Sequence, residues 1–329
     1  MKFLVTGGAG FVGSHLCRRL VSDGHEVTCV DNLITGQRGN ITDLLDQPAF
    51  RFVEADVTQT PTLNVDVIMH LASPASPVDY DRYPLETMTA NSQGTWRLLD
   101  IARETGARVV FVSTSEAYGD PLVHPQPETY WGNVDPIGPR ACYDESKRFG
   151  EALLMTYRRV HGVSAAIVRV FNTYGPAMRL DDGRVMPEFF GAAFAGEPLR
   201  VHGDGSQTRS FMYVDDLVEG LLHVALDKQA DGQVLNIGNP EEITIGELAE
   251  TIVRRFAPQA KVKSVPARDG DPKQRCPDIG RMIARYGWRP TVPLEDGLRA
   301  TADWYRGEVQ ARAVSSGEGQ HGGIGLAVG

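Results

Sequence analysis

A tyrosine and a lysine, Tyr143 and Lys147, stand four positions apart in a stretch whose apolar residues recur with a helical period. Residues at positions i and i+4 share one helix face, so the two side chains are expected to lie close together. An ammonium group beside a phenol favours the phenolate, which predicts a lowered pKa for Tyr143. Such a pair could remove the proton of an alcohol while a hydride leaves the same carbon. A solvated helix face would show the same spacing by chance.

A second polar group, Thr114-Ser115-Glu116, follows the apolar run 109–112. Catalytic groups of open α/β sheets gather at the carboxyl ends of strands, where this group would lie. The hydroxyls of Thr114 and Ser115 and the carboxylate of Glu116 could therefore belong to a catalytic site. Capping of the strand end is the alternative explanation for the hydroxyls.

A third group is the glycine series Gly7, Gly10 and Gly13, which directly follows a short apolar run. Glycine lets the chain turn sharply out of a strand, approach a pyrophosphate and pack a new helix against the sheet, and the N–H groups of that helix then face the phosphates. Asp31 ends the next apolar run, where a carboxylate can hold the ribose 2′-hydroxyl of NAD and would repel the 2′-phosphate of NADP. We therefore predict NAD, although such glycines can also form a turn alone.

Alternating strands and helices would position these groups. The predicted strands cover residues 2–6, 26–31, 51–54, 67–71, 108–113 and 165–169, and the predicted helices cover 13–23, 87–105 and 144–161. This alternation predicts an α/β fold with a Rossmann-like doubly wound parallel sheet. The two long helices are expected to cover the sheet with apolar sides that include Met88 and Phe149, and they could also form a dimer seam.

Prolines and glycines break the pattern after Arg169, which indicates a smaller C-terminal substrate-binding domain. We predict an NAD-binding domain over 1–170, with return segments near 211–240 that include a helix at 215–226 and a strand at 234–238. The second domain covers mainly 171–312 and holds an amphipathic helix at 245–256. The tail, 313–329, is rich in glycine and serine and is expected to be disordered.

The composition excludes several classes of protein. A net charge of -9 argues against a nucleic-acid partner, because phosphate binding needs a basic face. The four cysteines form no zinc-binding pattern, so no metal is expected, and Cys17 and Cys29 are predicted to be buried free thiols. The first strand begins directly and no apolar run approaches the length of a membrane span, so we expect a cytoplasmic protein without a signal peptide or membrane contact.

Longer runs carry a family resemblance. The segments HLASPASP (70–77), GPRACYDE (138–145), FNTYGP (171–176) and GSQTR (205–209), together with the glycines, Asp31, Tyr143 and Lys147, resemble the extended short-chain dehydrogenase/reductase superfamily and, within it, the UDP-glucuronic acid decarboxylases, or UDP-xylose synthases. The likeness extends from Lys2 to about Arg306.

The resemblance implies a carboxy-lyase that acts on UDP-glucuronate with a resident NAD. Oxidation at C4 would give a β-keto acid, which loses carbon dioxide, and return of the hydride would give UDP-xylose. Ser115 stands where the related 4,6-dehydratases usually have aspartate, so dehydration is disfavoured. The alternatives left open are release of UDP-4-keto-xylose with NADH and, with less support, a nucleotide-sugar 4-epimerase or 4,6-dehydratase.

The resemblance also implies a homodimer through the helices 87–105 and 144–161, and it assigns site residues. Those expected to be catalytic are Tyr143, Lys147, Thr114, Ser115, Glu116 and Arg209. Those expected at the cofactor are Gly7, Gly10, Phe11, Val12, Gly13, Asp31, Asn32, Gly36, Asp56, Val57, Leu71, Ser73, Tyr143, Lys147, Thr173 and Arg184. Those expected at the UDP-sugar are Pro77, Glu116, Asn172, Arg209, Tyr213 and Arg275, and Tyr157 is placed near substrate and cofactor. His70 is expected to serve structure.

One departure from the family pattern concerns substrate charge. Family members commonly show Lys-Thr-Asn where this chain has Thr89-Ala90-Asn91. A cation that could attract an anionic substrate is missing there, which bears on carboxylate affinity, on the final reduction and on substrate range.

Overall fold

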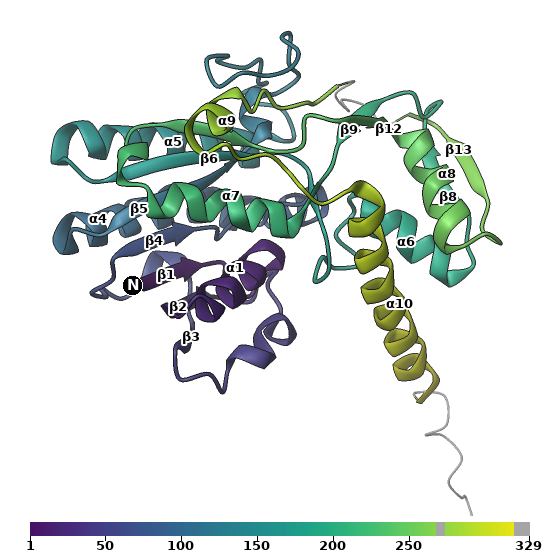
Figure 1. Ribbon diagram of the computed structural model, residues 1–329, viewed down its shortest axis with the longest axis horizontal. Helices are drawn as coiled ribbons and strands as arrows, with labels where there is room; N and C mark the ends of the chain where they lie inside the picture. The colour runs from purple at the N-terminus through teal and green to yellow at the C-terminus, as the bar shows by residue number, and fades with distance from the viewer. Residues whose placement is uncertain (268–273, 319–329) are drawn as a thin grey trace, which may run out of the picture.

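The computed structural model describes residues 1–267 and 274–318, and its centre is a seven-stranded sheet (Figure 1). The strands are β1 (Lys2–Thr6), β2 (Glu26–Asp31), β3 (Phe50–Glu54), β4 (Val67–His70), β5 (Arg108–Thr114), β6 (Ala165–Val170) and β11 (Val234–Ile237). Every pairing in the order β11-β6-β5-β4-β1-β2-β3 is parallel. The strand order reverses between β1 and β4, where ligands of such sheets bind. The predicted doubly wound fold is confirmed.

Helices cover both faces of the sheet, because each presents an apolar stripe to it. One face carries α1 (Phe11–Ser22), α7 (Val214–Leu226) and α9 (Gly280–Tyr286), and the other carries α3 (Pro84–Thr89), the π-helical turn η3 (Ala90–Gly94), α4 (Thr95–Thr105) and α5 (Ala141–His161). Leu16 and Leu221 pack beneath the first set, and Leu98 and Leu154 beneath the second. The carboxyl edge of the sheet therefore stays open between the two layers.

A smaller unit lies beside that edge and has its own core (Figure 1). Its helices are α6 (Val185–Ala195), α8 (Ile245–Phe256) and α10 (Leu294–Glu318), and its strands pair as β7 (Thr173–Tyr174) with β10 (Met212–Tyr213), β8 (Leu199–His202) with β13 (Val262–Val265), and β9 (Thr208–Ser210) with β12 (Glu242–Thr244). Phe189, Phe190, Leu248 and Tyr305 are buried between these elements. The short elements that complete the chain are η1 (Arg38–Leu44), η2 (Val57–Gln59), α2 (Pro77–Arg82), η4 (Ser115–Tyr118) and η5 (Lys228–Ala230).

The structure corrects several sequence expectations. The helix predicted over 87–105 starts at Pro84 and contains the π-helical turn, and the helix predicted from residue 144 starts at Ala141. Met88 and Phe149 are 45% and 47% exposed, so they do not cover the sheet. The expected disorder from residue 313 is wrong up to Glu318, because α10 extends that far, and 319–329 lie outside the described residues.

The prediction of buried free thiols at Cys17 and Cys29 is confirmed. Cys17 and Cys29 are fully buried, and all four cysteines are free thiols. Over the described part of the chain, no helix has the length and apolar character needed to cross a membrane.

Candidate active site

The glycine turn joins β1 to α1 in a form that only glycine allows. Gly7 has a φ of +74°, and a Cβ there would lie 2.7 Å from the backbone nitrogen of Ala72. A Cβ on Gly13 would lie 2.1 Å from the carbonyl oxygen of Gly7. Helix α1 begins after Gly10 with no side-chain cap among the described residues. Its first N–H groups and its positive dipole end therefore suit an anionic ligand such as a pyrophosphate.

Asp31 closes β2 and is fixed beside this turn. Its Oδ2 accepts a hydrogen bond from the Ala9 N–H at 3.0 Å, and its Oδ1 accepts one from the Leu33 N–H at 2.8 Å. Burial raises the pKa of Asp31, and the two N–H donors oppose that shift. Each oxygen keeps acceptor capacity toward the cavity, which fits the two hydroxyls of a ribose.

A cavity of about 420 Å³ runs from the glycine turn to the second unit. With Tyr213 and Tyr157 excepted, every residue that the sequence assigned to catalysis, cofactor or substrate lines it. Tyr213 instead packs on Tyr174, with ring centroids 5.7 Å apart, toward α10. Tyr157 donates a hydrogen bond to Asp100 Oδ1 on α4 at 2.9 Å. The structure therefore does not support those two placements.

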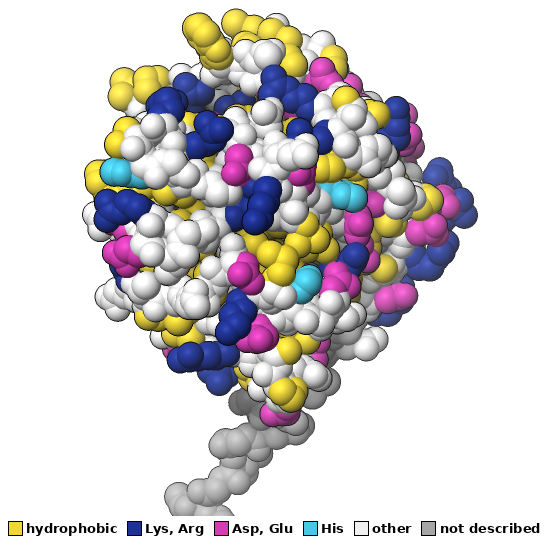
Figure 2. All heavy atoms as spheres, turned by 60° about the vertical axis from the view of Figure 1, so that its left-hand side comes forward, with side chains coloured by type: hydrophobic (Ala, Val, Ile, Leu, Met, Phe, Trp, Pro, Cys, Tyr) yellow, Lys and Arg dark blue, Asp and Glu magenta, His cyan; other side chains and the backbone are white. Residues whose placement is uncertain are grey.

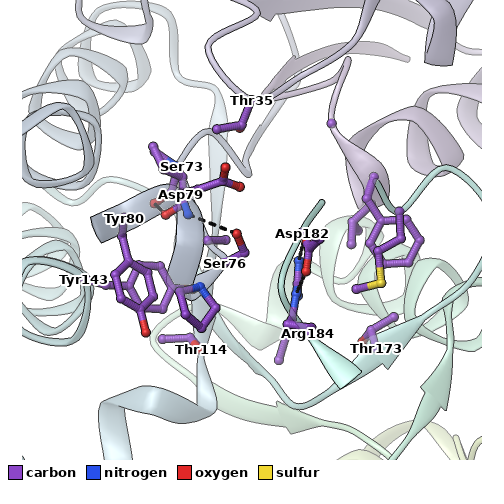
Figure 3. A pocket seen from close by; sticks show the side chains of 18 of the residues that line it. Thr35, Ser73, Ser76, Asp79, Tyr80, Thr114, Tyr143, Thr173, Asp182 and Arg184 are labelled. Carbon is purple, nitrogen blue, oxygen red and sulfur yellow. Dashed lines mark hydrogen bonds and ion pairs between the residues drawn. The ribbon is translucent and has the colours of Figure 1, made fainter. Parts of the chain in front are cut away.

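Tyr143 lies in the wall of the cavity with its ring stacked on Tyr80, at 5.3 Å between centroids and 12° between planes (Figure 3). Burial raises the pKa of Tyr143 to about 12. Thr114 and Arg184 act in the opposite direction, through a hydrogen bond and through charge. The chain by itself does not lower this pKa, because desolvation of the phenolate, with the charges of Glu116 and Asp144, outweighs the effects of Thr114 and Arg184.

Lys147 does not supply the expected charge effect. Its Nζ donates to the carbonyl oxygen of Val112 at 2.9 Å and lies 6.0 Å from the centre of the Tyr143 ring. Burial lowers the pKa of Lys147 itself to about 7, against an attraction from Glu151. A lysine with this pKa can give or take a proton near neutral pH.

Glu116 is held between two arginines at the end of β5. It forms ion pairs with Arg140 and with Arg275, which brings together residues from three distant segments. Burial alone would raise the pKa of Glu116, but Arg275 and Arg140, with a smaller effect from Arg209, hold it below its usual value. Asp144 lies nearby, and burial together with the charge of Glu116 raises its pKa to about 7.

The opposite wall of the cavity carries Arg184, which pairs with Asp182 (Figure 3). Burial would lower the pKa of Arg184, but Asp182 raises it. Asn172 also lines the cavity, and its buried Nδ2 lacks a partner among the described residues. Such an orphaned donor costs free energy unless a ligand oxygen accepts its hydrogen bond, which a diphosphate would do.

Asn91 and Arg179 each make two hydrogen bonds that join separate segments at or beside the cavity. Asn91, in the π-helical turn, donates to Ser73 Oγ and Ser146 Oγ, each at 3.0 Å, and so ties the loop after β4 to α5. Arg179 donates to Asp79 Oδ1 at 2.6 Å and to the Thr35 carbonyl oxygen at 3.0 Å. The hydrogen bonds of Arg179 therefore join the two units beside the cavity.

His70 serves structure, in line with the expectation. It lies in β4 between the hydroxyls of Thr6 and Thr95, at 2.9 and 3.1 Å. Burial lowers its pKa to about 3, so the ring is neutral.

Sequence reasoning missed several lining residues, namely Asp79, Tyr80, Arg140, Arg179 and Asp182. Arg140 lies inside a run that carried the family resemblance, so its position beside Tyr143 was a usable signal. The pairs Asp79–Arg179 and Tyr80–Tyr143 join distant segments, and their contacts depend on the tertiary fold.

Comparison with known proteins agrees with this geometry. A UDP-glucuronic acid decarboxylase 6 from Arabidopsis thaliana is 48% identical over 307 residues, which cover 93% of this chain and 89% of that protein. A UDP-glucuronic acid decarboxylase 1 from Danio rerio is 47% identical over 312 residues, covering 95% of this chain and 74% of that protein.

Among solved structures, the UDP-glucuronic acid 4-epimerase from Bacillus cereus, in complex with UDP-glucuronic acid and NAD, superposes with a TM-score of 0.82 at 30% identity. The match covers 94% of this chain and 100% of that one. The prediction of NAD as the cofactor is confirmed by this likeness and by a family model that matches residues 3–238. The chain belongs to the NAD dependent epimerase/dehydratase family.

Proposed function

We propose that this protein is a carboxy-lyase that converts UDP-glucuronate to UDP-xylose and carbon dioxide with a resident NAD. The observation that carries the proposal is the convergence of Tyr143, Lys147, Thr114 and the arginine-flanked Glu116 on one cavity. The names of the relatives at 47% and 48% identity support the substrate and the reaction type.

The proposed reaction starts at the C4 hydroxyl of the sugar. The Gly7–Gly13 turn and Asp31 would hold NAD, which would supply a reversible hydride acceptor for C4 and a positive charge that favours the phenolate. Tyr143 takes the hydroxyl proton as C4 becomes a ketone. The C6 carboxylate is then β to a carbonyl group, and its C–C bond breaks to release carbon dioxide and leave an enolate. Tyr143 and Thr114 donate hydrogen bonds to the enolate oxygen.

The arginines bind the acidic substrate in this proposal. Arg209 and Arg275 line the cavity near Glu116, and guanidinium groups suit bidentate contacts with carboxylate or phosphate. They would offset the missing cation at Thr89, where the family pattern described above commonly has lysine. Glu116 keeps its charge between Arg140 and Arg275 and orients water toward C5, where the enolate is reprotonated.

The remaining assignments also stay proposals. We assign cofactor binding to residues 1–170 with return segments near 211–240, and sugar-nucleotide binding mainly to 171–312. The site residues predicted from the sequence keep their roles, except Tyr213 and Tyr157, which do not line the cavity.

Product analysis tests the reaction. The purified protein is incubated with UDP-glucuronate and catalytic NAD, while NMR follows the sugar and absorbance follows NADH. The expected result is UDP-xylose and carbon dioxide without net NADH. Stoichiometric NADH with UDP-4-keto-xylose would contradict the final reduction, and an epimerised sugar without carbon dioxide would contradict decarboxylation altogether.

We also propose a homodimer formed through α4 and α5. Trp96 and Phe149 are 50% and 47% exposed, and they line a shallow groove together with Arg97 and Asp100. Figure 2 shows hydrophobic side chains among the charged ones on the side of the molecule where α4 and α5 end. Exposed aromatic groups of this kind favour a protein interface.

The protein's four free thiols support a location in the reducing cytoplasm.

A further inference from the structure

A second cluster of chemically active side chains lies outside the cavity, where His124, Glu242 and Cys276 meet. A ring nitrogen, a carboxylate oxygen and the sulfur lie within 4.8 Å of one another. Nε2 of His124 is 3.0 Å from Oε2 of Glu242. Within residues 1–267 and 274–318 this is the one group of three such side chains with this spacing. The three come from distant segments, so no sequence spacing reveals them.

The fold itself brings these side chains together. The Gln126 N–H donates to the Cys276 carbonyl oxygen and the Cys276 N–H donates to Gln126 Oε1, both at 2.9 Å, so the segments of His124 and Cys276 are tied side by side. Glu242 lies on β12, which pairs with β9, and its Oε1 accepts from Thr208 Oγ1 at 2.6 Å. Outer hydrogen bonds of this kind orient the ligands of a metal ion.

The donor set selects the type of ion. One nitrogen, one oxygen and one sulfur suit Zn²⁺ and similar transition metals, whereas Mg²⁺ and Ca²⁺ prefer oxygen alone. Zinc bonds of about 2.0–2.3 Å place neighbouring ligands roughly 3–4 Å apart. The three donor atoms, all within 4.8 Å of one another, reach that spacing with a small movement of the side chains. Cys276 is buried, while the side chains of His124 and Glu242 are 35% and 26% exposed. An ion can therefore enter from solvent and keep a water as its fourth ligand.

We propose that His124, Glu242 and Cys276 bind Zn²⁺ or a similar transition-metal ion with tetrahedral geometry. The thiol proton leaves to solvent as the thiolate–metal bond forms, and the hydrogen bond from the thiol to the Pro240 carbonyl oxygen is lost.

This site is linked to the arginines of the cavity by the chain. Cys276 directly follows Arg275, and Thr208, which anchors Glu242, directly precedes Arg209. A bound ion therefore ties together the two segments that carry these arginines and stabilises that corner of the fold.

Cobalt is the probe, because tetrahedral Co²⁺ bound to a thiolate gives intense d–d and sulfur-to-metal absorption bands. The full-length protein, freed of metal with a chelator, is titrated with Co²⁺, then with Zn²⁺ or Mg²⁺. We expect one ion per chain with a thiolate band, displacement by Zn²⁺ and none by Mg²⁺, and a Zn²⁺-dependent rise in the midpoint of thermal unfolding. Cys276→Ser should remove the thiolate band, and His124→Gln should weaken Co²⁺ binding at least tenfold.

Cys142→Ser is the matched control, because Cys142 is the more exposed thiol and should leave the cobalt spectrum unchanged. His124→Gln alters a partly exposed side chain and tests the site even if Cys276→Ser fails to fold. Binding without a thiolate band, loss of the band in Cys142→Ser, or full affinity in His124→Gln would overturn the proposal. These readouts require no turnover, so they stand apart from the proposed reaction.

Discussion

The ring of Tyr143 stacks on Tyr80, whereas its buried hydroxyl is the group that can exchange a proton. The two parts of the side chain can therefore be tested separately. The Tyr80 ring holds the Tyr143 ring in place, while burial makes the phenolate costly until positive charge accumulates around it. The hydroxyl should therefore matter for proton transfer and little for the shape of the cavity.

Removing that hydroxyl should greatly reduce turnover and leave NAD affinity nearly unchanged. Tyr143→Phe keeps the ring and should reduce turnover about 10²–10⁴-fold, the usual contribution of a general base. NAD affinity, measured by titration calorimetry, should stay within about threefold of wild type, because the glycine turn and Asp31 are untouched. Tyr80→Phe is the control that keeps the base and should retain most activity. Undiminished turnover in Tyr143→Phe would refute the assignment of the base.

Asp144 gives the stability a defined pH dependence. Its pKa is raised from 3.8 to about 7, so between those values the native state holds a proton that the unfolded chain has lost. Stability from this group is therefore full at low pH and is lost as pH rises through 7. Lys147, lowered from 10.5 to about 7, acts above pH 7 in the opposite direction.

The variant Asp144→Asn should remove the Asp144 contribution alone. Between pH 5 and pH 8 its free energy of unfolding should fall less than that of wild type, by a difference on the order of 2 kcal/mol. Urea unfolding at the two pH values measures this, and Asp46→Asn, at an exposed position, should follow wild type. Parallel pH profiles for Asp144→Asn and wild type would show that Asp144 titrates normally.

At the scale of elements, the turn from β1 to α1 leaves no room for a side chain. A Cβ on Gly13 would lie 2.1 Å from the Gly7 oxygen and 2.7 Å from the Gly8 Cα, and both are backbone atoms that cannot move aside. Gly13→Ala should cost several kcal/mol of stability and abolish NAD binding. Gly39→Ala, where a Cβ meets nothing within 4 Å, should be nearly neutral. Thermal unfolding and NAD titration compare the two, and equal behaviour would contradict the packing argument.

The elements also show where sequence reasoning succeeds and where it ends. Gly7, Gly13 and Lys147 were predictable, because a turn out of a strand and the spacing on a helix face are local rules. Tyr213 does not line the cavity, because its ring packs on Tyr174, and this contact between two strands was not readable from the sequence.

The ion pair between Arg179 and Asp79 and the raised pKa of Tyr143 could not be predicted from local sequence rules. The ion pair joins residues about a hundred positions apart, and the pKa shift depends on burial that only the folded chain creates. The π-helical turn at Ala90–Gly94 interrupts the regular helical period, so the helix predicted over 87–105 is divided there. Its start at Pro84 had a local signal, because proline suits the first position of a helix.

At the scale of the molecule, the exposed aromatic groups of α4 and α5 allow a test of assembly. Trp96→Arg should convert the proposed dimer to a monomer in light scattering, because a charge would be buried at the seam without a partner. Trp131→Arg changes a residue that is 88% exposed elsewhere, and it should leave the mass unchanged. A monomeric wild-type protein, or a Trp96→Arg variant that stays dimeric, would contradict the proposed interface at α4 and α5.

The sheet is completed by a strand that arrives late in the chain. β11 pairs with β6 only after the chain has built part of the second unit, and Gly232 N–H reaches back to the Ala165 carbonyl oxygen at 2.7 Å. During synthesis, β6 is therefore an unpaired edge until residue 237 has left the ribosome. Unpaired strand edges promote aggregation, so a fragment that stops at residue 170 should lack a complete sheet and should aggregate. The two units are separate in space but interlaced along the chain, and neither can be cut away cleanly at a single bond.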